Sequence, residues 1–495
     1  MKNTFVPINR IPHDVLSLIP DYWADEDTAD DDLITLTHVC HGWRELFISR
    51  PSLWARLDCK NVEKTRTYIE RSQSSPLKVY LWNEAGCIPF LYDAFFLTVP
   101  HFGRLGSLSF LGVSEDLIEL AKKHFYRPAP SLEKLKIHIG DPCSIEPTIF
   151  DGNLSTLREL RLSGVITSLP WKNLANLTKF DFQDVPSDKI STTQLPDSFE
   201  RAPLLRKIRL YHTLPTTSNA PPGRVVSLPH LEDLEIEAQP VHSILLKHLL
   251  IPSGTSLVLE FNFNGERSPI PDYLPKTLDN LNNLSRTTAI NLSYESGLHL
   301  RLSGPSGGLY VLGHWTGADT FLSTVNRRVL RSLNHFTIST TERLTITAFG
   351  ATIPQKTEKS PVYHTLLLMK SLRILILTDC LNIPFISALN PDKTPSKTLV
   401  CPVLEELVLY VKKKEWFCID KLLGMAKGRS SSGARLSTIT IVSTQEFMPV
   451  ENVLELRNHV SRVEYRLDNV MPLWDKIGHE DDQGCEGGWG YESGW

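Results

Sequence analysis

Residues 157–162 read Leu-Arg-Glu-Leu-Arg-Leu, and the spacing of their leucines indicates the fold. Leucine-like residues fill the first, fourth and sixth places. The last two share one face of a strand, because side chains alternate between its two faces. The same spacing occurs five more times between residues 105 and 236. These five copies begin at Leu105, Leu132, Leu177, Leu205 and Leu231. With the copy at Leu157 included, successive copies begin 20 to 28 residues apart.

This step is typical of leucine-rich repeats, whose period is about 20–29 residues and whose units each add one strand to a parallel sheet. The pattern returns at Leu372, Leu404 and Leu436, at longer steps of 32 residues. Between the two arrays, residues 287–312 alternate apolar side chains around glycines, which is typical of antiparallel hairpins. The sequence therefore predicts an α/β fold, with an irregular leucine-rich-repeat solenoid over residues 101–470 and an irregular or inserted β region at about 255–343.

The composition is that of a folded protein, with 41% hydrophobic and 22% charged residues in a chain of 495. Its strongest apolar run, residues 364–377, is interrupted by Lys370 and Arg373 and is too short to span a bilayer. The first 16 residues do not contain the unbroken apolar region of a signal peptide. We therefore expect a cytoplasmic or nuclear protein with no membrane partner.

Charge and cysteine content exclude two classes of partner. The net charge is -4, but residues 21–32 hold seven acids and residues 478–495 hold five, so the rest of the chain carries +8. That excess is too small for a nucleic-acid partner. The eight cysteines form no C-x-x-C pair. This pattern favours reduced, individually buried thiols over disulfides or a zinc site, and we expect no metal and no cofactor.

Two apolar patterns precede the repeats. The first predicts a short helix whose opening turn suits the fixed φ of a proline, and its members are Ile11, Pro12, Val15, Leu16 and Ile19. The second predicts one longer helix that begins after three aspartates and ends before Pro51. Its apolar stripe consists of Leu33, Leu36, Cys40, Trp43 and Phe47. Leu53 and Trp54 follow this helix as an apolar anchor.

Short helices of this kind bury little surface by themselves. Exposing Trp43, Phe47 and Trp54 together would therefore be costly without a partner. The segment also resembles the F-box. Residues 11–16 resemble its leucine-proline-x-acidic-aliphatic-leucine opening, residues 39–44 its valine-cysteine-x-x-tryptophan-arginine helix, and residues 53–54 its closing pair. The acidic insert at 21–32 departs from the family's short spacing between the first two helices, and an altered docking at that loop is what this departure implies.

The resemblance implies that residues 1–57 bind a Skp-family adaptor, which links F-box proteins to a cullin scaffold. The adaptor-binding residues would be Ile11, Pro12, Val15, Leu16, Ile19, Leu36, Val39, Trp43, Leu53 and Trp54. An ordinary helical cap on the repeats, with Trp43 and Trp54 in its core, is the alternative interpretation. Residues 58–100 are expected to connect the F-box to the repeats through a helix at 62–71 and a strand at 77–81, as in large fungal F-box families.

Residues between the buried leucines point to the opposite face of the sheet, the face on which solenoids bind partners. This face is charged in the early strands and apolar in the late ones. The predicted substrate-binding residues are Arg161, Arg209, Ile374, Ile376, Val408 and Tyr410. The acidic tail at 471–495, rich in glycine and tryptophan, is expected to be disordered. Docking of residues 478–495 onto the late strands is an equal alternative.

The motifs of serine hydrolases, zinc proteases and phosphate-binding loops are absent from the sequence, so we expect no catalytic residue and no enzymatic activity. The glycine cluster at 304–308 is expected to form a turn. Taken together, the sequence predicts a substrate-recognition subunit of an SCF-type E3 ubiquitin ligase, with the F-box on the adaptor and the repeats on an unidentified protein substrate. A leucine-rich-repeat interaction scaffold that acts outside a ubiquitin ligase is the alternative.

Overall fold

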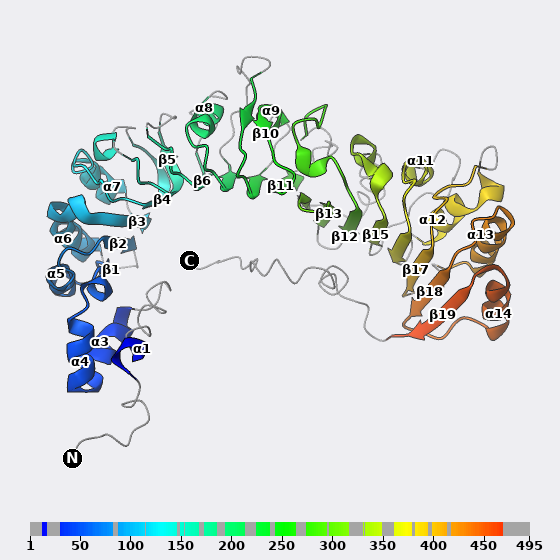
Figure 1. Ribbon diagram of the computed structural model, residues 1–495, viewed down its shortest axis with the longest axis horizontal. Coiled ribbons are helices and arrows are strands. Elements are labelled where there is room, and N and C mark those ends of the chain that lie inside the picture. The colour runs from blue at the N-terminus through cyan, green and yellow to red at the C-terminus, as the bar shows by residue number, and fades with distance from the viewer. Residues whose placement is uncertain are drawn as a thin grey trace. The chain divides into compact units, whose positions relative to one another are not determined.

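The chain is a mixed α/β protein whose strands pair mostly in parallel, as seen in the computed structural model of Figure 1. It divides into two compact units, Met1–Glu260 with Asp272–Asn283 and Phe261–Pro271 with Leu284–Trp495. The structure describes residues 12–16, 30–82, 88–113, 115–145, 149–152, 154–167, 173–185, 194–212, 224–237, 243–263, 274–294, 297–315, 330, 332–348, 361–378, 382–394, 398–412 and 417–468.

The first unit begins with short helices. They are α1 (His13–Leu16), α3 (Asp30–Val39) and α4 (His41–Ile48), followed by the 3-10 turn η2 (Pro51–Trp54). The single longer helix expected over this stretch is wrong, because Cys40 adopts an extended backbone with φ -160° and ψ 171° and separates α3 from α4. Arg44 then donates from Nε to the carbonyl oxygen of Thr37 at 3.0 Å, which stabilises the corner. As a result Thr37, not Cys40, takes the buried position in the stripe, and Cys40 is exposed.

The predicted helix at 62–71 is confirmed as α5 (Val62–Arg71). Its first turn is capped by Asn61, whose side chain accepts a hydrogen bond from the Lys64 amide at 3.0 Å. Further helices of this unit are α6 (Ile88–Thr98), α7 (Glu115–Lys122), α8 (Gln194–Glu200) and α9 (Ser243–Lys247). They lie along one face of the unit's sheet (Figure 1).

The strands of the first unit run parallel, each paired with the next in the order β1, β2, β3, β4, β5, β6, β7, β9, β11. Their bounds are β1 (Arg56–Leu57), β2 (Leu77–Trp82), β3 (Leu105–Val113), β4 (Lys134–Ser144), β5 (Glu159–Ile166), β6 (Lys179–Gln183), β7 (Lys207–Tyr211), β9 (Asp233–Glu237) and β11 (Ser256–Phe263). A separate parallel pair joins β8 (Val226–Ser227) to β10 (Leu249–Leu250). The parallel pairing expected from the repeat spacing is confirmed.

The repeated leucine pattern sets the register of this sheet. Its second position is paired from strand to strand and is buried at Leu135, Leu160, Phe180, Ile208 and Leu234. Each of these strands therefore places its apolar side chains on the face that the helices cover, and each such side chain contributes about 1.5–3 kcal/mol by burial.

Threonine side chains also join neighbouring segments of the chain just ahead of two strands, β5 and β11. Thr156 donates from its hydroxyl to the carbonyl oxygen of Leu132 at 2.9 Å. Thr255 makes the same bond to Leu231 at 2.7 Å. These bonds satisfy backbone carbonyl oxygens at the turns, where the sheet ladder has not yet begun.

A cluster of phenylalanines fills the space between sheet and helices near the start of the repeats. Ring centroids of neighbouring members lie 5.2 to 6.1 Å apart, in tilted or edge-to-face arrangements, and the members are Phe95, Phe102, Phe110, Phe125 and Phe150. One glycine is required in this region. Gly164 in β5 has φ +69°, and a Cβ there would lie 2.3 Å from the Ile139 carbonyl oxygen.

The second unit opens with the antiparallel hairpins expected at 287–312. They join β12 (Ala289–Tyr294), β13 (Gly297–Ser303) and β14 (Gly308–Trp315). The glycine cluster forms the expected turn between β13 and β14, where Gly304 N donates to Gly307 O at 2.8 Å. β12 also pairs in parallel with β15 (Arg343–Ala348).

Parallel pairing then continues through β16 (Ile374–Thr378), β17 (Glu406–Val411), β18 (Thr438–Ser443) and β19 (Arg462–Leu467). The helices α11 (Pro361–Leu368), α12 (Asn382–Leu389), α13 (Ile419–Ser431) and α14 (Val450–His459) pack successively against one another. They lie along one face of this unit's sheet (Figure 1). The tail at 471–495 and most of the acidic insert lie outside the described residues.

Candidate functional site

The N-terminal helices form a small core of their own. Leu16, Leu33, Trp43 and Phe47 are buried, and the rings of Trp43 and Phe47 meet edge to face with centroids 5.6 Å apart. These residues recur at helical spacing within α3 and within α4, so the two helices can turn their apolar sides toward each other. The predicted adaptor residues Leu16 and Trp43 therefore hold this module together from inside.

Trp54 joins these helices to α5. Its indole N–H donates to the Phe47 carbonyl oxygen at 2.9 Å, and its ring meets Tyr68 of α5 at 4.9 Å. The Arg71 guanidinium lies 4.3 Å from the ring centroid, in the geometry of a cation–π contact. The expectation that the tryptophans need an external partner is thus wrong. The sequence could not show that α5 folds against Trp54 and buries it.

Other apolar side chains of the same helices remain exposed. Val39, at the end of α3, is 53% exposed and Val15 of α1 is 46% exposed. Ile34 and Ile48 are exposed as well. We call these four residues the apolar rim.

The ten predicted adaptor residues therefore differ in how accessible they are to a partner. Pro12, Val15 and Val39 are exposed, and Leu36 is half-buried. Leu16, Trp43, Leu53 and Trp54 are buried. Ile11 and Ile19 lie outside the described residues. Sequence reasoning did not single out Ile34 and Ile48, which fall off the apolar stripe.

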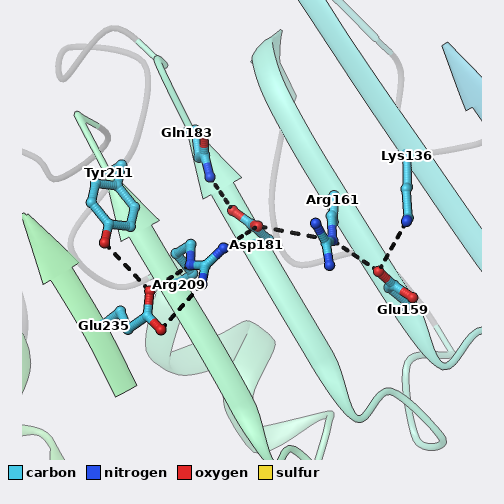
Figure 2. Close-up of polar contacts among 8 residues, drawn as sticks. All are labelled: Lys136, Glu159, Arg161, Asp181, Gln183, Arg209, Tyr211 and Glu235. Atoms are coloured by element: carbon cyan, nitrogen blue, oxygen red, sulfur yellow. Dashed lines mark hydrogen bonds and ion pairs between the residues drawn. The ribbon is translucent and has the colours of Figure 1, made fainter. Parts of the chain in front are cut away.

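A grid of charged side chains covers the open face of the first unit's sheet, the face opposite to the buried leucines. Strand pairing aligns its first row as Lys134, Glu159, Lys179, Lys207 and Asp233 on strands β4, β5, β6, β7 and β9. The second row, aligned in the same way, is Lys136, Arg161, Asp181, Arg209 and Glu235. Figure 2 shows how the second row and its neighbours connect.

Arg161 lies between two carboxylates in this grid (Figure 2). Its Nε is 2.8 Å from Glu159 Oε1 and 4.0 Å from Asp181 Oδ2. Lys136 approaches Glu159 Oε1 from the other side at 3.6 Å. The two carboxylates are buried, with side-chain exposures of 7% and 12%, whereas the Arg161 side chain is 45% exposed. The face thus presents cations to solvent and keeps the acids beneath them.

The two buried carboxyls respond oppositely to these surroundings. Burial raises the pKa of Glu159, but neighbouring positive charges outweigh it and hold the pKa below its usual value. These charges belong to Lys136, Arg161, Lys179 and Lys134. Burial also raises the pKa of Asp181. There it prevails over the hydrogen bond from Gln183 and the charges of Arg209 and Arg161. The pKa of Glu159 thus lies below the usual glutamate value, and the pKa of Asp181 lies above the usual aspartate value.

At the β7 and β9 end of the grid, the charged side chains pair with one another. Arg209 Nη2 donates to Glu235 Oε1 at 3.1 Å, while its Nε lies 2.5 Å from the other oxygen. The Tyr211 hydroxyl donates to Glu235 at 3.3 Å, and Lys207 lies 2.6 Å from Asp233. Since Arg209 already meets a carboxylate in a two-point contact, it is less available to a ligand than Arg161.

Two aromatic side chains on the same face were not predicted. Tyr80 and Trp82 of β2 alternate with buried Leu77, Val79 and Leu81. Cations lie over both rings, Arg56 at 4.9 Å from Tyr80 and Lys60 at 5.5 Å from Trp82. The alternation in residues 77–82 was a sufficient signal, but the strand was expected to end at Leu81.

The late strands bring the predicted apolar residues together but leave them little exposed area. Ile376 is paired with Val408, and Thr378 with Tyr410. Ile376 and Val408 are buried, and Ile374 and Tyr410 are half-buried. Of the apolar surface expected on β16 and β17, only the partly exposed side chains of Ile374 and Tyr410 remain accessible.

Cysteine and metal chemistry add nothing to these surfaces. Of the five cysteines that the structure describes, Cys59, Cys143 and Cys401 are buried thiols as expected, whereas Cys40 is exposed and Cys418 is half-buried. No group of three or more His, Cys, Asp or Glu residues within the described ranges is arranged to hold a metal ion. None of the described helices is long and apolar enough to cross a membrane.

Compared with known proteins, the chain matches no family model and no curated protein. The functional assignment therefore rests on the residues themselves. They offer two separate surfaces, the apolar rim on α1, α3 and α4 and the charged open face of β4 to β9.

Proposed function

We propose that this chain is a substrate-recognition subunit of an SCF-type E3 ubiquitin ligase. In this proposal residues 1–57 are an F-box that binds a Skp-family adaptor and, through it, a cullin. The parallel strands behind it form an irregular leucine-rich-repeat solenoid that binds a protein substrate. The chain itself supplies no catalytic residue, needs no cofactor, and acts in the cytoplasm or nucleus.

The apolar rim carries the adaptor half of the proposal. Val15, Ile34, Val39 and Ile48 remain exposed after the module has formed its own core. These four side chains provide apolar surface on short helices that a bound adaptor would cover. The ordered motif at 11–16, 39–44 and 53–54 supports the identity of that interface.

The open face of the first unit supports the substrate half. Its long charged side chains stand on a parallel sheet. Helices cover the other face of this sheet and support it (Figure 1). Repeat proteins use such faces to bind partners. The late strands support this role less, because Ile376 and Val408 are buried.

A scaffold outside a ubiquitin ligase is the second candidate, and one observation favours it. Trp43 and Trp54 are core residues of the chain, as a simple helical cap would require. The two candidates differ in one respect: only the ligase subunit must bring a cullin into the same complex through the adaptor.

Reconstitution from purified components separates them. The tagged intact chain should recover a cullin only when a Skp-family adaptor is present. The variant Val39→Asp should recover neither, because it places a charge on the apolar rim. Deleting residues 1–57 is a poorer test, because it also removes core contacts of the remaining chain. These are the ring contact of Trp54 with Tyr68 and the pairing of β1 with β2. Val450→Asp, at an exposed valine of α14, is the matched control. Failure of the intact chain to recover the adaptor would rule out the ligase role.

A further inference from the structure

Four cations surround one buried carboxylate on the open face of the first unit. Strand pairing places Lys134 and Lys179 on either side of Glu159, and the ion pairs place Lys136 and Arg161 above it. We call Lys134, Lys136, Arg161 and Lys179 the cationic cluster. Its four positive charges face the carboxylates of Glu159 and Asp181, so the cluster carries a local excess of +2.

The cluster has donors to spare. Arg161 approaches Glu159 and Asp181 most closely through Nε, and among the described residues its terminal nitrogens donate no hydrogen bond. Lys134 and Lys179 are exposed and contact no carboxylate at salt-bridge distance in the described part of the chain. Oε1 of Glu159 has no well-aligned hydrogen bond there either, although two cations lie near it. Glu159 therefore occupies only a few of the N–H donors that the cationic cluster provides.

The spacing of the cluster fits several separate single charges. Neighbouring strands lie about 4.8 Å apart, so a cluster on β4, β5 and β6 extends over about 10 Å. In an extended peptide, side chains on one side recur about every 7 Å. Two or three carboxylates of one acidic peptide can therefore each reach a different cation. The guanidinium fork of Arg161, whose side chain is 45% exposed, matches a planar carboxylate in two-point geometry.

Two other anionic partners fit less well. A phosphate concentrates its charge at one point, whereas these donors are spread over three strands. A nucleic acid is a continuous polyanion and would meet Asp233, Glu235 and Glu237 where the grid ends at β9. The sequence pI of about 6.5 is also far below that of typical nucleic-acid-binding domains.

We propose that the cationic cluster binds a short, extended acidic segment of the protein substrate, through carboxylates of aspartate or glutamate. This inference rests on the proposed receptor function and deepens it by naming the class of segment that the receptor selects. Tyr80 and Trp82 on β2 lie on the same face beyond β3, so apolar side chains beside the acidic residues would meet aromatic surface there.

Fluorescence anisotropy with the intact chain tests the proposal. The probe is a short fluorescein-labelled peptide in which glutamate alternates with serine, and glutamine replaces glutamate in the matched peptide. The glutamate peptide should bind and the glutamine peptide should not. The double variant Arg161→Gln with Lys179→Gln should weaken binding about three- to tenfold, as expected for exposed ion pairs. Glu159→Gln should instead strengthen binding, because it removes the negative charge beneath the ligand.

The control double variant is Lys123→Gln with Lys247→Gln. It removes the same net charge from exposed lysines of the same unit, near α7 and α9, and should leave binding unchanged. Each variant is compared with the wild type for an unchanged thermal unfolding midpoint, so that a folding defect is not read as lost binding. Equal weakening in both double variants, equal binding of both peptides, or weaker binding by Glu159→Gln would overturn the proposal.

Two further probes address the nature of the anion. A peptide with one phosphoserine and a short single-stranded RNA should each bind less tightly than the glutamate peptide, and tighter binding of either would overturn the proposal. Adaptor capture depends on Val39 and not on the cluster. Loss of peptide binding with intact adaptor capture therefore sinks this inference alone, and the reverse result sinks the ligase role alone.

Discussion

The indole N–H of Trp54 donates to the carbonyl oxygen of Phe47 at 2.9 Å, and this bond links the end of α4 to η2, just ahead of β1. Trp54 stands between two elements, because its ring also contacts Tyr68 and Arg71 of α5. The N-terminal helices and α5 are therefore packed against each other at this point. Interface variants must avoid Trp54 if they are to report on binding.

Trp54→Ala should lower the free energy of unfolding by about 3–5 kcal/mol, the usual cost of emptying a buried aromatic site. Trp54→Phe should cost less, since it keeps most of the ring and loses the hydrogen bond. Urea unfolding followed by circular dichroism measures both. Trp82→Ala is the matched control at a tryptophan that is 46% exposed, and it should cost less than about 1 kcal/mol. Equal costs at the two positions would show that Trp54 is not a core residue.

Arg429 on α13 is fully buried and faces backbone, with no carboxylate partner among the described residues. Its Nη1 and Nη2 donate to the carbonyl oxygens of Val400 and Cys401 at 2.8 and 2.9 Å. Arg429→Met should destabilise the second unit by about 2–5 kcal/mol, because two buried carbonyl groups lose charged donors. Arg435→Met, at an exposed arginine, should have little effect. A neutral result at Arg429 in chemical unfolding would contradict this role.

The two buried carboxyls of the open face should make opposite contributions to acid stability. The pKa of Glu159 is lowered in the folded state, so its contribution is present above the unfolded pKa of about 4.3 and is lost as pH falls through the folded pKa. The pKa of Asp181 is raised, so its contribution is present at low pH and is lost as pH rises through the folded pKa.

Glu159→Gln should therefore lose less stability than the wild type on acidification from about pH 6 to about pH 3, and Asp181→Asn should lose more. Unfolding free energies at the two pH values give both differences. If both variants shift in the same direction, the assignment of these charges is incorrect.

Thiol labelling should discriminate Cys40 from Cys401. Burial raises the pKa of Cys401 to about 12, so at neutral pH almost none of it is the reactive thiolate. Cys40 is exposed at the joint between α3 and α4. Maleimide followed by mass spectrometry should modify Cys40 in the folded chain and Cys401 only after unfolding. Comparable rates at the two positions would show that the Cys401 thiol is not buried in the folded chain.

Much of the fold follows from local spacing. The pattern that begins at Leu132, Leu157 and Leu177 anticipates β4, β5 and β6, because a strand alternates its side chains whatever surrounds it. The helix predicted at residues 62–71 likewise has the bounds of α5. Such features depend on residues close together in the chain.

The parts that could not be predicted depend on distant residues. The stripe through Cys40 is continuous in the sequence, yet the backbone becomes extended there and two helices result. Ile376 and Val408 were expected to be accessible, but they pair across neighbouring strands and are buried. The excess charge around Glu159 likewise exists only because three strands align in register.

The affinity of the purified intact chain for a purified Skp-family adaptor, measured by titration calorimetry, tests the central claim most directly. The account predicts a one-to-one complex with a dissociation constant of about 1 μM or tighter, or about -8 kcal/mol. Val39→Asp should weaken it at least about tenfold, while Val450→Asp should leave it unchanged. No measurable binding by the intact chain, or equal binding by the Val39 variant, would contradict the proposed F-box.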